Sequence, residues 1–150
     1  MEKKKYTIPQ IRLSYVSDHL SEYPKIRMSN DIVDFIRSTY DDGEIEYRES
    51  FKVVYLNGDN KILGFQTISE GGTLATVADM KIVFTGALLS NACSIVLCHN
   101  HPSGNVMPST EDDRITRKAK TAGENLDINV IDHVIIARNR YYSYSDEGRL

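Results

Sequence analysis

The stretch CSIVLCHNHPSGNVMPSTEDDRI, residues 93–115, decides the fold that the sequence predicts. Its apolar beginning predicts a buried strand, and His99 and His101 stand at the end of that strand. Side chains at positions i and i+2 of a strand point to the same face, so both imidazoles are expected on one side. A Pro-Ser-Gly break then turns the chain, and Ser109 precedes a predicted helix whose first turn contains Asp112.

Two imidazoles and one carboxylate form a ligand set that suits zinc. A zinc site with three protein ligands keeps a fourth position for water and is typical of hydrolytic rather than structural centres. His99, His101 and Asp112 are therefore the candidate zinc ligands. A His-x-His pair is common in proteins without metal, so the prediction depends on the turn, the serine and the carboxylate that follow the pair.

The spacing of these residues resembles the signature of the JAMM (MPN-plus, JAB) metalloproteases. The chain has His99-x-His101, seven intervening residues and then Ser109-x-x-Asp112, and its string HNHPSG followed by PS-x-x-D is similar to the RadC branch of that family. The similarity extends from residue 30 to the end of the chain. It implies a zinc-dependent metallohydrolase, a metallopeptidase or isopeptidase.

The same resemblance implies roles for acidic and hydroxyl side chains. In the JAMM pattern a glutamate at the first strand of a hairpin acts as general base on the zinc-activated water, and Glu49 in Arg-Glu-Ser-Phe matches that position. Taken alone, Glu49 would be a solvated residue at a strand end, and Glu46 is a less well-aligned competitor. The Ser109 hydroxyl is expected to donate to the oxyanion of the tetrahedral intermediate or to serve only as a helix N-cap, and the two roles are compatible.

Outside the central stretch, the sequence predicts a first helix, a hairpin and two final strands. Residues 31–40 predict a helix capped by Ser29 or Asn30, and residues 48–69 predict a hairpin that turns at Asn57-Gly58-Asp59-Asn60. A short acidic loop lies between them, and the chain ends in two strands around VIDHVIIA and YYSY.

Two further helices have apolar stripes that predict buried faces. Asp79 is expected to cap the first, and the second is expected to run from about Thr110 to Leu126. The predicted core positions are Met80, Val83, Phe84, Ala87 and Leu88 in the first and Ile115, Ala119, Ala122 and Leu126 in the second.

These elements together predict an α/β fold: a single domain with a mixed, curved β-sheet flanked by helices, which is the architecture that the JAB/MPN resemblance also implies. The predicted division is an N-terminal arm over residues 1–28 and a RadC-like JAB/MPN-plus domain over residues 29–150. The architecture is broadly like that of the cytidine deaminases. A deaminase is rejected, because it would need His-x-Glu and Pro-Cys-x-x-Cys, and the sequence contains neither.

The other potential metal-binding side chains have different expected roles. His133 lies in an apolar run and is expected to be a buried histidine with a hydrogen-bond partner rather than a fourth ligand. Cys93 and Cys98 are separated by an odd offset, so they should lie on opposite faces of the strand. They are predicted to be small core residues that cannot bridge each other.

Length and composition limit the remaining possibilities. With 150 residues and 41% hydrophobic content, one domain with a sizeable core is expected. The sequence has neither a membrane-length apolar run nor an apolar region behind its basic start, so a cytoplasmic protein without a membrane partner is expected. The net charge of −3 argues against tight, phosphate-driven binding of nucleic acid.

The expected partner is therefore a peptide or protein substrate, with weak or no direct nucleic-acid binding. The alternative is a non-catalytic RadC-like module associated with DNA repair or DNA processing. RadC-like chains usually carry an N-terminal helix-hairpin-helix segment, for which this sequence leaves no room, so weak binding of DNA is expected. The presence of all five motif positions favours the enzyme, and the oligomeric state, a homodimer included, stays open.

Overall fold

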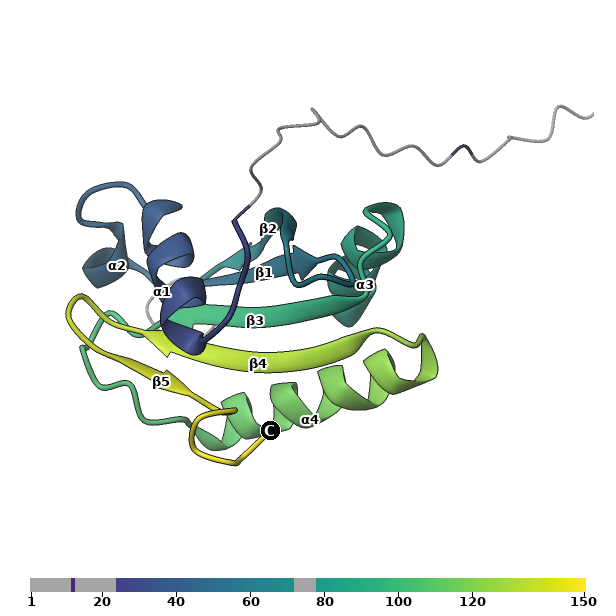
Figure 1. Ribbon diagram of the computed structural model, residues 1–150. Coiled ribbons are helices and arrows are strands. Elements are labelled where there is room, and N and C mark those ends of the chain that lie inside the picture. The colour runs from purple at the N-terminus through teal and green to yellow at the C-terminus, as the bar shows by residue number, and fades with distance from the viewer. Residues whose placement is uncertain (1–11, 13–23, 72–77) are drawn as a thin grey trace, which may run out of the picture.

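The computed structural model describes residue 12, residues 24–71 and residues 78–150 (Figure 1). Its elements in chain order are α1 (Ser29–Ser38), α2 (Glu44–Tyr47), β1 (Ser50–Leu56), β2 (Ile62–Glu70), α3 (Met80–Leu89), β3 (Ser94–Asn100), α4 (Thr110–Asn125), β4 (Asn129–Ile136) and β5 (Tyr141–Ser143). The predicted α/β class is confirmed. Most of the predicted arm, residues 1–28, lies outside the described residues.

The five strands form one mixed sheet in the order β2-β1-β3-β4-β5. All neighbours are antiparallel except β3 and β4, which are parallel. A parallel pair needs a crossover connection, and α4 provides it, running alongside β4 in Figure 1. β3 therefore lies in the middle of the sheet, and all its residues are buried, which explains the apolar run that predicted this strand.

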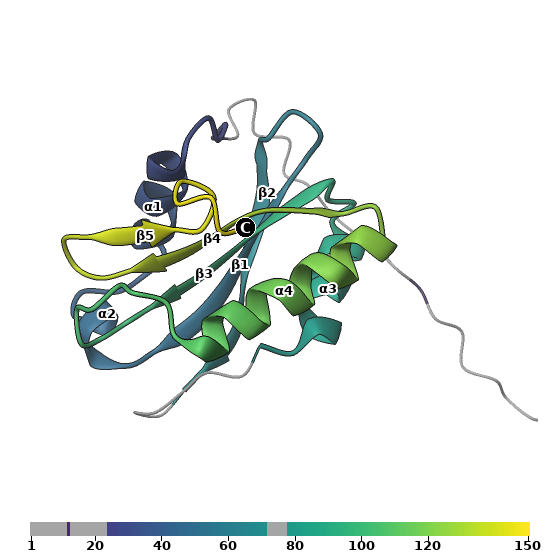
Figure 2. The same ribbon diagram turned by 90° about the horizontal axis from the view of Figure 1, so that it is seen from below.

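Helices cover both faces of the sheet. Alternation along β3 sends Ile95 and Leu97 into the core beneath α3 and α4, and Val96 and Cys98 into the core beneath α1. Figure 2 shows α3 and α4 on one side of the strands and α1 on the other. By the same alternation, His99 belongs to the α4 side.

The β1–β2 hairpin forms as predicted, with its turn at residues 57–60. The Asn57 side chain accepts hydrogen bonds from the backbone N–H groups of Asp59 and Lys61, both at 2.9 Å. Asn60 adopts a φ of 58°, in the left-handed region that asparagine tolerates better than most residues. This turn sets the register between β1 and β2, and that register positions the residues just before β1.

The start of α1 differs from the prediction. The N-cap is Met28, not Ser29 or Asn30, and the Asp31 carboxylate accepts from the backbone N–H groups of Arg27 at 2.7 Å and Met28 at 3.1 Å. Ser29 does not serve as the cap, because its hydroxyl donates to the Asp146 carboxylate near the C-terminus.

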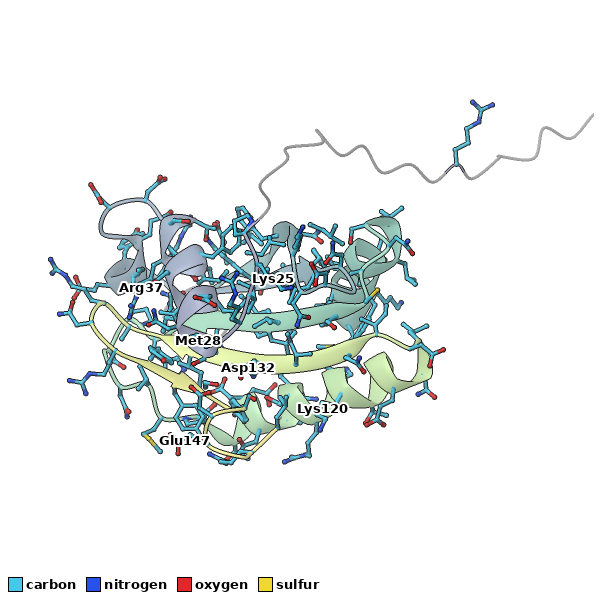
Figure 3. The ribbon with its side chains drawn as sticks, in the orientation of Figure 1. Lys25, Met28, Arg37, Lys120, Asp132 and Glu147 are labelled. Atoms are coloured by element: carbon cyan, nitrogen blue, oxygen red, sulfur yellow. The ribbon has the colours of Figure 1, made fainter. Side chains whose placement is uncertain are left out.

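The other end of α1 is tied to the β4–β5 turn. Arg37 reaches across from α1 and donates to the backbone carbonyls of Ala137 and Arg140, each at 3.0 Å (Figure 3). This contact fixes the turn relative to the helix layer.

Two predicted core leucines are exposed, and one helix was missed. Asp79 caps α3 as expected, but Leu88 near its C-terminus is 58% exposed, whereas Val83, Phe84 and Ala87 are buried. α4 ends at Asn125, and the Ile128 N–H returns to the Gly123 carbonyl, so Leu126 lies at the helix end and points outward. α2 forms where only an acidic loop was predicted.

The cysteines are both free, and only one is in the core. Cys98 is buried as predicted, whereas Cys93 precedes β3 and is exposed, so its core assignment is wrong. Within the described ranges, no helix combines the length and the apolar character needed to cross a membrane.

Candidate metal centre

The two histidines of the His-x-His pair lie at the end of β3, facing the N-terminus of α4. Pairing of β1 with β3 places Phe51 opposite His99, and the two rings stack with an interplanar angle of 13°. His101 follows the strand, and its backbone N–H still donates to the Ile136 carbonyl of β4 at 2.9 Å. The His99 side chain is 1% exposed and that of His101 17%, so the pair extends from the core toward solvent.

The structure brings together the three side chains that the sequence singled out. The Nε2 atoms of His99 and His101 are 3.0 Å apart. Asp112 Oδ1 lies 3.0 Å from His99 Nε2, and Asp112 Oδ2 lies 3.6 Å from His101 Nε2. A tetrahedral zinc ion with bonds of about 2.0 to 2.2 Å separates its ligand atoms by about 3.3 to 3.6 Å, so only a small adjustment would be needed.

The outer nitrogen of His101 is held by the loop that follows it. His101 Nδ1 lies 2.6 Å from the carbonyl oxygen of Asn105. A carbonyl can only accept, so Nδ1 carries a proton. In the neutral ring Nε2 then presents a lone pair toward Asp112, and in the protonated ring Nε2 donates to that carboxylate. Burial alone would lower the pKa of His101, but the hydrogen bonds with Asp112 and Asn105 outweigh burial and raise it.

A capping box at the start of α4 orients Asp112. The Ser109 hydroxyl accepts from the Asp112 N–H at 3.1 Å, while Asp112 Oδ2 accepts from the Ser109 N–H at 2.7 Å and from its hydroxyl at 2.8 Å. Burial would raise the pKa of Asp112, but hydrogen bonds from His101, His99 and Ser109 hold it well below the usual range. The N-cap role of Ser109 is confirmed, and its role toward an oxyanion stays a prediction.

The chemistry of this group of atoms fits a cation. Electron-pair donors from His101 and Asp112 face the Nε2 atom of His99, and only Asp112 brings a negative charge. Two imidazole nitrogens and one carboxylate oxygen are ligand types that zinc accepts, and a set of three keeps a position for water or substrate. His99, His101 and Asp112 could therefore hold a metal ion.

Glu49 lies directly before β1 and is half-buried. Phe51 pairs with His99, so the alternation of β1, continued to the residue two positions before Phe51, would place Glu49 on the same face of the sheet, in the direction of His101. The charge of Glu49 contributes to the raised pKa of His101. Glu46, the competitor, is exposed on α2 and forms an ion pair with Arg138 at 3.4 Å. Which of the two carboxylates acts as the base stays a prediction.

Sequence reasoning missed Asn100, which lies between the two histidines on the opposite face of β3. Its amide donates to the carbonyls of Ile45 and Arg48, both at 2.8 Å, and its oxygen accepts from the Ser50 N–H at 2.8 Å. Asn100 therefore holds the chain on both sides of Glu49. The signal was available, since an amide in a fully buried strand must find hydrogen-bond partners.

His133 is buried, as the sequence predicted. Its ring is 0% exposed and contacts His99 and Thr116. Burial lowers the pKa of His133 well below its usual value, and the neighbouring His99 acts in the same direction. Thr116, on α4, was not singled out from the sequence.

A cavity of about 550 Å³ opens beside the half-buried candidate ligand His101. It lies between the loop after β3, α2 and the β4–β5 turn, and is lined by Glu46, His101, Pro102, Ser103, Gly104, Asn105, Ala137, Arg138, Asn139 and Arg140. Of the three candidate ligands, His101 lines this cavity, which is large enough for a peptide segment.

Comparison with known families agrees with this geometry. The model of the RadC-like JAB domain matches residues 26–149. The chain belongs to the RadC-like JAB domain family. Membership agrees with the mixed sheet, the flanking helices and the cluster of His99, His101 and Asp112.

Curated relatives of this RadC-like chain are UPF0758 proteins. One from Flavobacterium johnsoniae is 46% identical over 106 residues, which is 71% of this chain and 46% of that protein. One from Desulfitobacterium hafniense is 39% identical over 141 residues, 93% of this chain and 60% of that protein. One from Chlorobaculum tepidum is 35% identical over 126 residues, 84% of this chain and 55% of that protein. The chain thus spans about half the length of the curated relatives it matches, whose name describes no activity.

Proposed function

We propose that this RadC-like domain is a zinc-dependent hydrolase of peptide or isopeptide bonds. The observation that carries the proposal is the convergence of His99, His101 and Asp112 within 4.8 Å of one another, beside an accessible cavity. Glu49, two positions before Phe51, is the general base that we propose, and its charge acts on His101. Membership in the JAB family supports hydrolysis as the reaction class.

Bound zinc would supply a hydroxide nucleophile at neutral pH by lowering the pKa of a water from about 15.7 to near 7. The residues of the chain provide the proton transfers. Glu49 accepts the proton of the attacking water and returns it to the leaving amine. The Ser109 hydroxyl, which donates to Asp112 Oδ2, has to turn toward the substrate before it can donate to the oxyanion.

The test combines metal analysis with a cleavage assay. Protein purified without added zinc is expected to contain about one zinc ion per chain, and Asp112→Asn is expected to lose it. The wild type should cleave members of a panel of peptides and isopeptide-linked substrates. Glu49→Gln should keep its zinc while hydrolysis falls by about 10²-fold or more.

Two matched variants sharpen the assignment. Glu147→Gln removes an exposed carboxylate near the C-terminus and should leave both zinc content and hydrolysis unchanged. Glu46→Gln tests the competitor directly. Loss of hydrolysis in Glu46→Gln but not in Glu49→Gln would identify Glu46, on α2, as the general base. A wild type that binds no zinc would overturn the proposed function.

A further inference from the structure

Behind the candidate ligand His99 lies a buried chain of hydrogen bonds that leads back to α4. His99 Nδ1 is 2.9 Å from His133 Nε2, and His133 Nδ1 is 2.6 Å from the Thr116 hydroxyl. The Thr116 hydroxyl is in turn 2.7 Å from the backbone carbonyl of Asp112. All of these side chains are buried. The chain thus begins and ends at residues that also supply candidate ligands.

The direction of each hydrogen bond follows from the last contact. The Asp112 carbonyl can only accept, so Thr116 must use its single proton there. The Thr116 oxygen can then only accept from His133, which places the His133 proton on Nδ1. In a neutral ring, His133 Nε2 is left as an acceptor, and His99 Nδ1 must donate to it.

The result is that His99 keeps a proton on Nδ1, which makes Nε2 the nitrogen that is available to a metal. This Nε2 atom faces Asp112 Oδ1 and His101 Nε2, where the metal would bind. If His133 carried its proton on Nε2 instead, that proton would point at His99 Nδ1 and leave His99 protonated on Nε2. The same ring could then not bind a metal.

We propose that His133 is a positioning residue for the metal site, and that Thr116 sets the tautomer through which His133 acts. Ring packing supports this role, because Tyr144 stacks on His133 with an interplanar angle of 6° and Phe51 stacks on His99. Metal-binding histidines usually donate their second nitrogen to a carboxylate, a carbonyl or water, and such partners strongly affect metal affinity. Here the partner is a second imidazole.

This inference rests on the proposed metal site, but its first test needs no metal. Protein labelled with ¹⁵N in its histidines reports the tautomer of each ring through long-range ¹H–¹⁵N spectra. In metal-free protein, His133 is expected to be neutral and protonated on Nδ1, and zinc-loaded His99 should show the same tautomer. A His133 ring protonated on Nε2 in metal-free protein overturns the relay, whether or not the wild type binds zinc.

The second test is zinc affinity, measured by competition with a chromophoric chelator. Thr116→Val removes the hydroxyl at nearly constant shape, and its affinity is expected to fall by about 10- to 100-fold. Thr116→Ser keeps the hydroxyl and should remain close to the wild type. Ile115→Val, a neighbouring core change on α4 outside the relay, controls for disturbed packing, and urea unfolding confirms that each variant is folded.

The outcomes separate the positioning role from a purely structural one. Loss of affinity in Thr116→Val, with recovery in Thr116→Ser, supports the relay. Equal affinities in the two Thr116 variants, whether both normal or both reduced, contradict it. A wild type that binds no zinc contradicts the proposed function instead, and the tautomer of His133 still decides the relay.

Discussion

Single residues decide whether the candidate site can form, because several of its polar side chains are buried and serve as hydrogen-bond partners for one another. Asn100 is 0% exposed, and three backbone groups depend on its amide. His133 is equally buried and links His99 to Thr116. Removing one member of such a network leaves another polar group without its partner, which costs more than the lost hydrogen bond.

Asn100→Asp is expected to be strongly destabilising although it is almost isosteric. The substitution turns the donor that serves Ile45 and Arg48 into a carboxylate oxygen facing two carbonyls. We expect a loss of about 2 to 4 kcal/mol in the free energy of unfolding, measured with urea. In the folded variant, hydrolysis should fall while zinc content stays, because the displaced segment carries Glu49 rather than a ligand.

Asn139→Asp is the matched control, since Asn139 is exposed in the β4–β5 turn. The same chemical change should alter its stability by less than about 0.5 kcal/mol. Similar losses in the two variants would show that the Asn100 hydrogen bonds contribute little.

The lowered pKa of Asp112 predicts how the stability of the metal-free protein depends on pH. Burial opposes ionisation of Asp112, but hydrogen bonds from His101, His99 and Ser109 keep its folded pKa well below the unfolded value of about 3.9. The unfolded chain therefore binds this proton more readily. Its contribution to stability is complete above the unfolded pKa and is lost as the pH falls below it.

Urea unfolding of metal-free protein from about pH 6 to pH 3 measures this effect. Asp112→Asn cannot titrate at this position, so its stability should decline less steeply below about pH 5 than that of the wild type. Parallel curves for the two proteins would show that the Asp112 carboxylate is not stabilised in the folded state.

Much of the candidate site could be predicted from the sequence, because its ligands are close together in the chain. The i, i+2 rule placed His99 and His101 on one face, and the capping pattern placed Asp112 in the first helical turn. The contact of His99 with His133 could not be predicted. It depends on the register between β3 and β4, which no local pattern encodes.

At the scale of elements, predictions that rest on local sequence patterns were confirmed, and some predictions that depend on how elements pack were wrong. The β1–β2 hairpin and the end strands follow local turn chemistry and were predicted. Leu88 and Leu126 continue apolar stripes beyond the point where their helices still face the sheet, so periodicity assigned them wrongly to the core. Periodicity identifies a helical face, but the extent of the neighbouring layer decides which residues of that face are buried.

Gly123→Ala tests how tightly α4 packs at its C-terminal end. Helix propensity alone predicts a gain of about 1 kcal/mol for alanine over glycine. However, a Cβ at position 123 would lie 2.3 Å from the backbone carbonyl oxygen of Ile128, which cannot move without shifting the start of β4. We expect the steric clash to outweigh the gain in helix propensity, with a net loss of about 1 to 3 kcal/mol in the free energy of unfolding.

Gly64→Ala in β2 is the control, because a Cβ there meets nothing within 4 Å. Thermal or urea unfolding should show little change for this variant. A stabilised Gly123→Ala would mean that the connection between α4 and β4 adjusts easily.

At the scale of the whole molecule, charge predicts weak binding of this chain to duplex DNA. The net charge is −3. Of the cationic residues on the exposed face of α4, Arg114 is already paired with Glu111 at 2.6 Å, which leaves Arg117 and Lys118 as the remaining candidates for phosphate contacts.

Two to three phosphate contacts correspond to a log–log salt slope of about −2 to −3 and to a Kd of about 10⁻⁴ to 10⁻⁶ M or weaker. Fluorescence anisotropy with labelled duplexes of different sequence, at physiological salt, measures both quantities. Submicromolar binding with a steep salt slope would favour the non-catalytic DNA-processing module over the peptidase.

The candidate ligands all come from residues 99–112, whereas the proposed base, Glu49, arrives through a different strand. Evolution can therefore alter the two contributions separately. A single codon change at position 49 would remove the proposed base and leave the three candidate ligands in the sequence. A lineage of such domains could thus lose or regain the proposed base in one step, whereas a lineage that has lost its candidate ligands would need several coordinated changes to recover them.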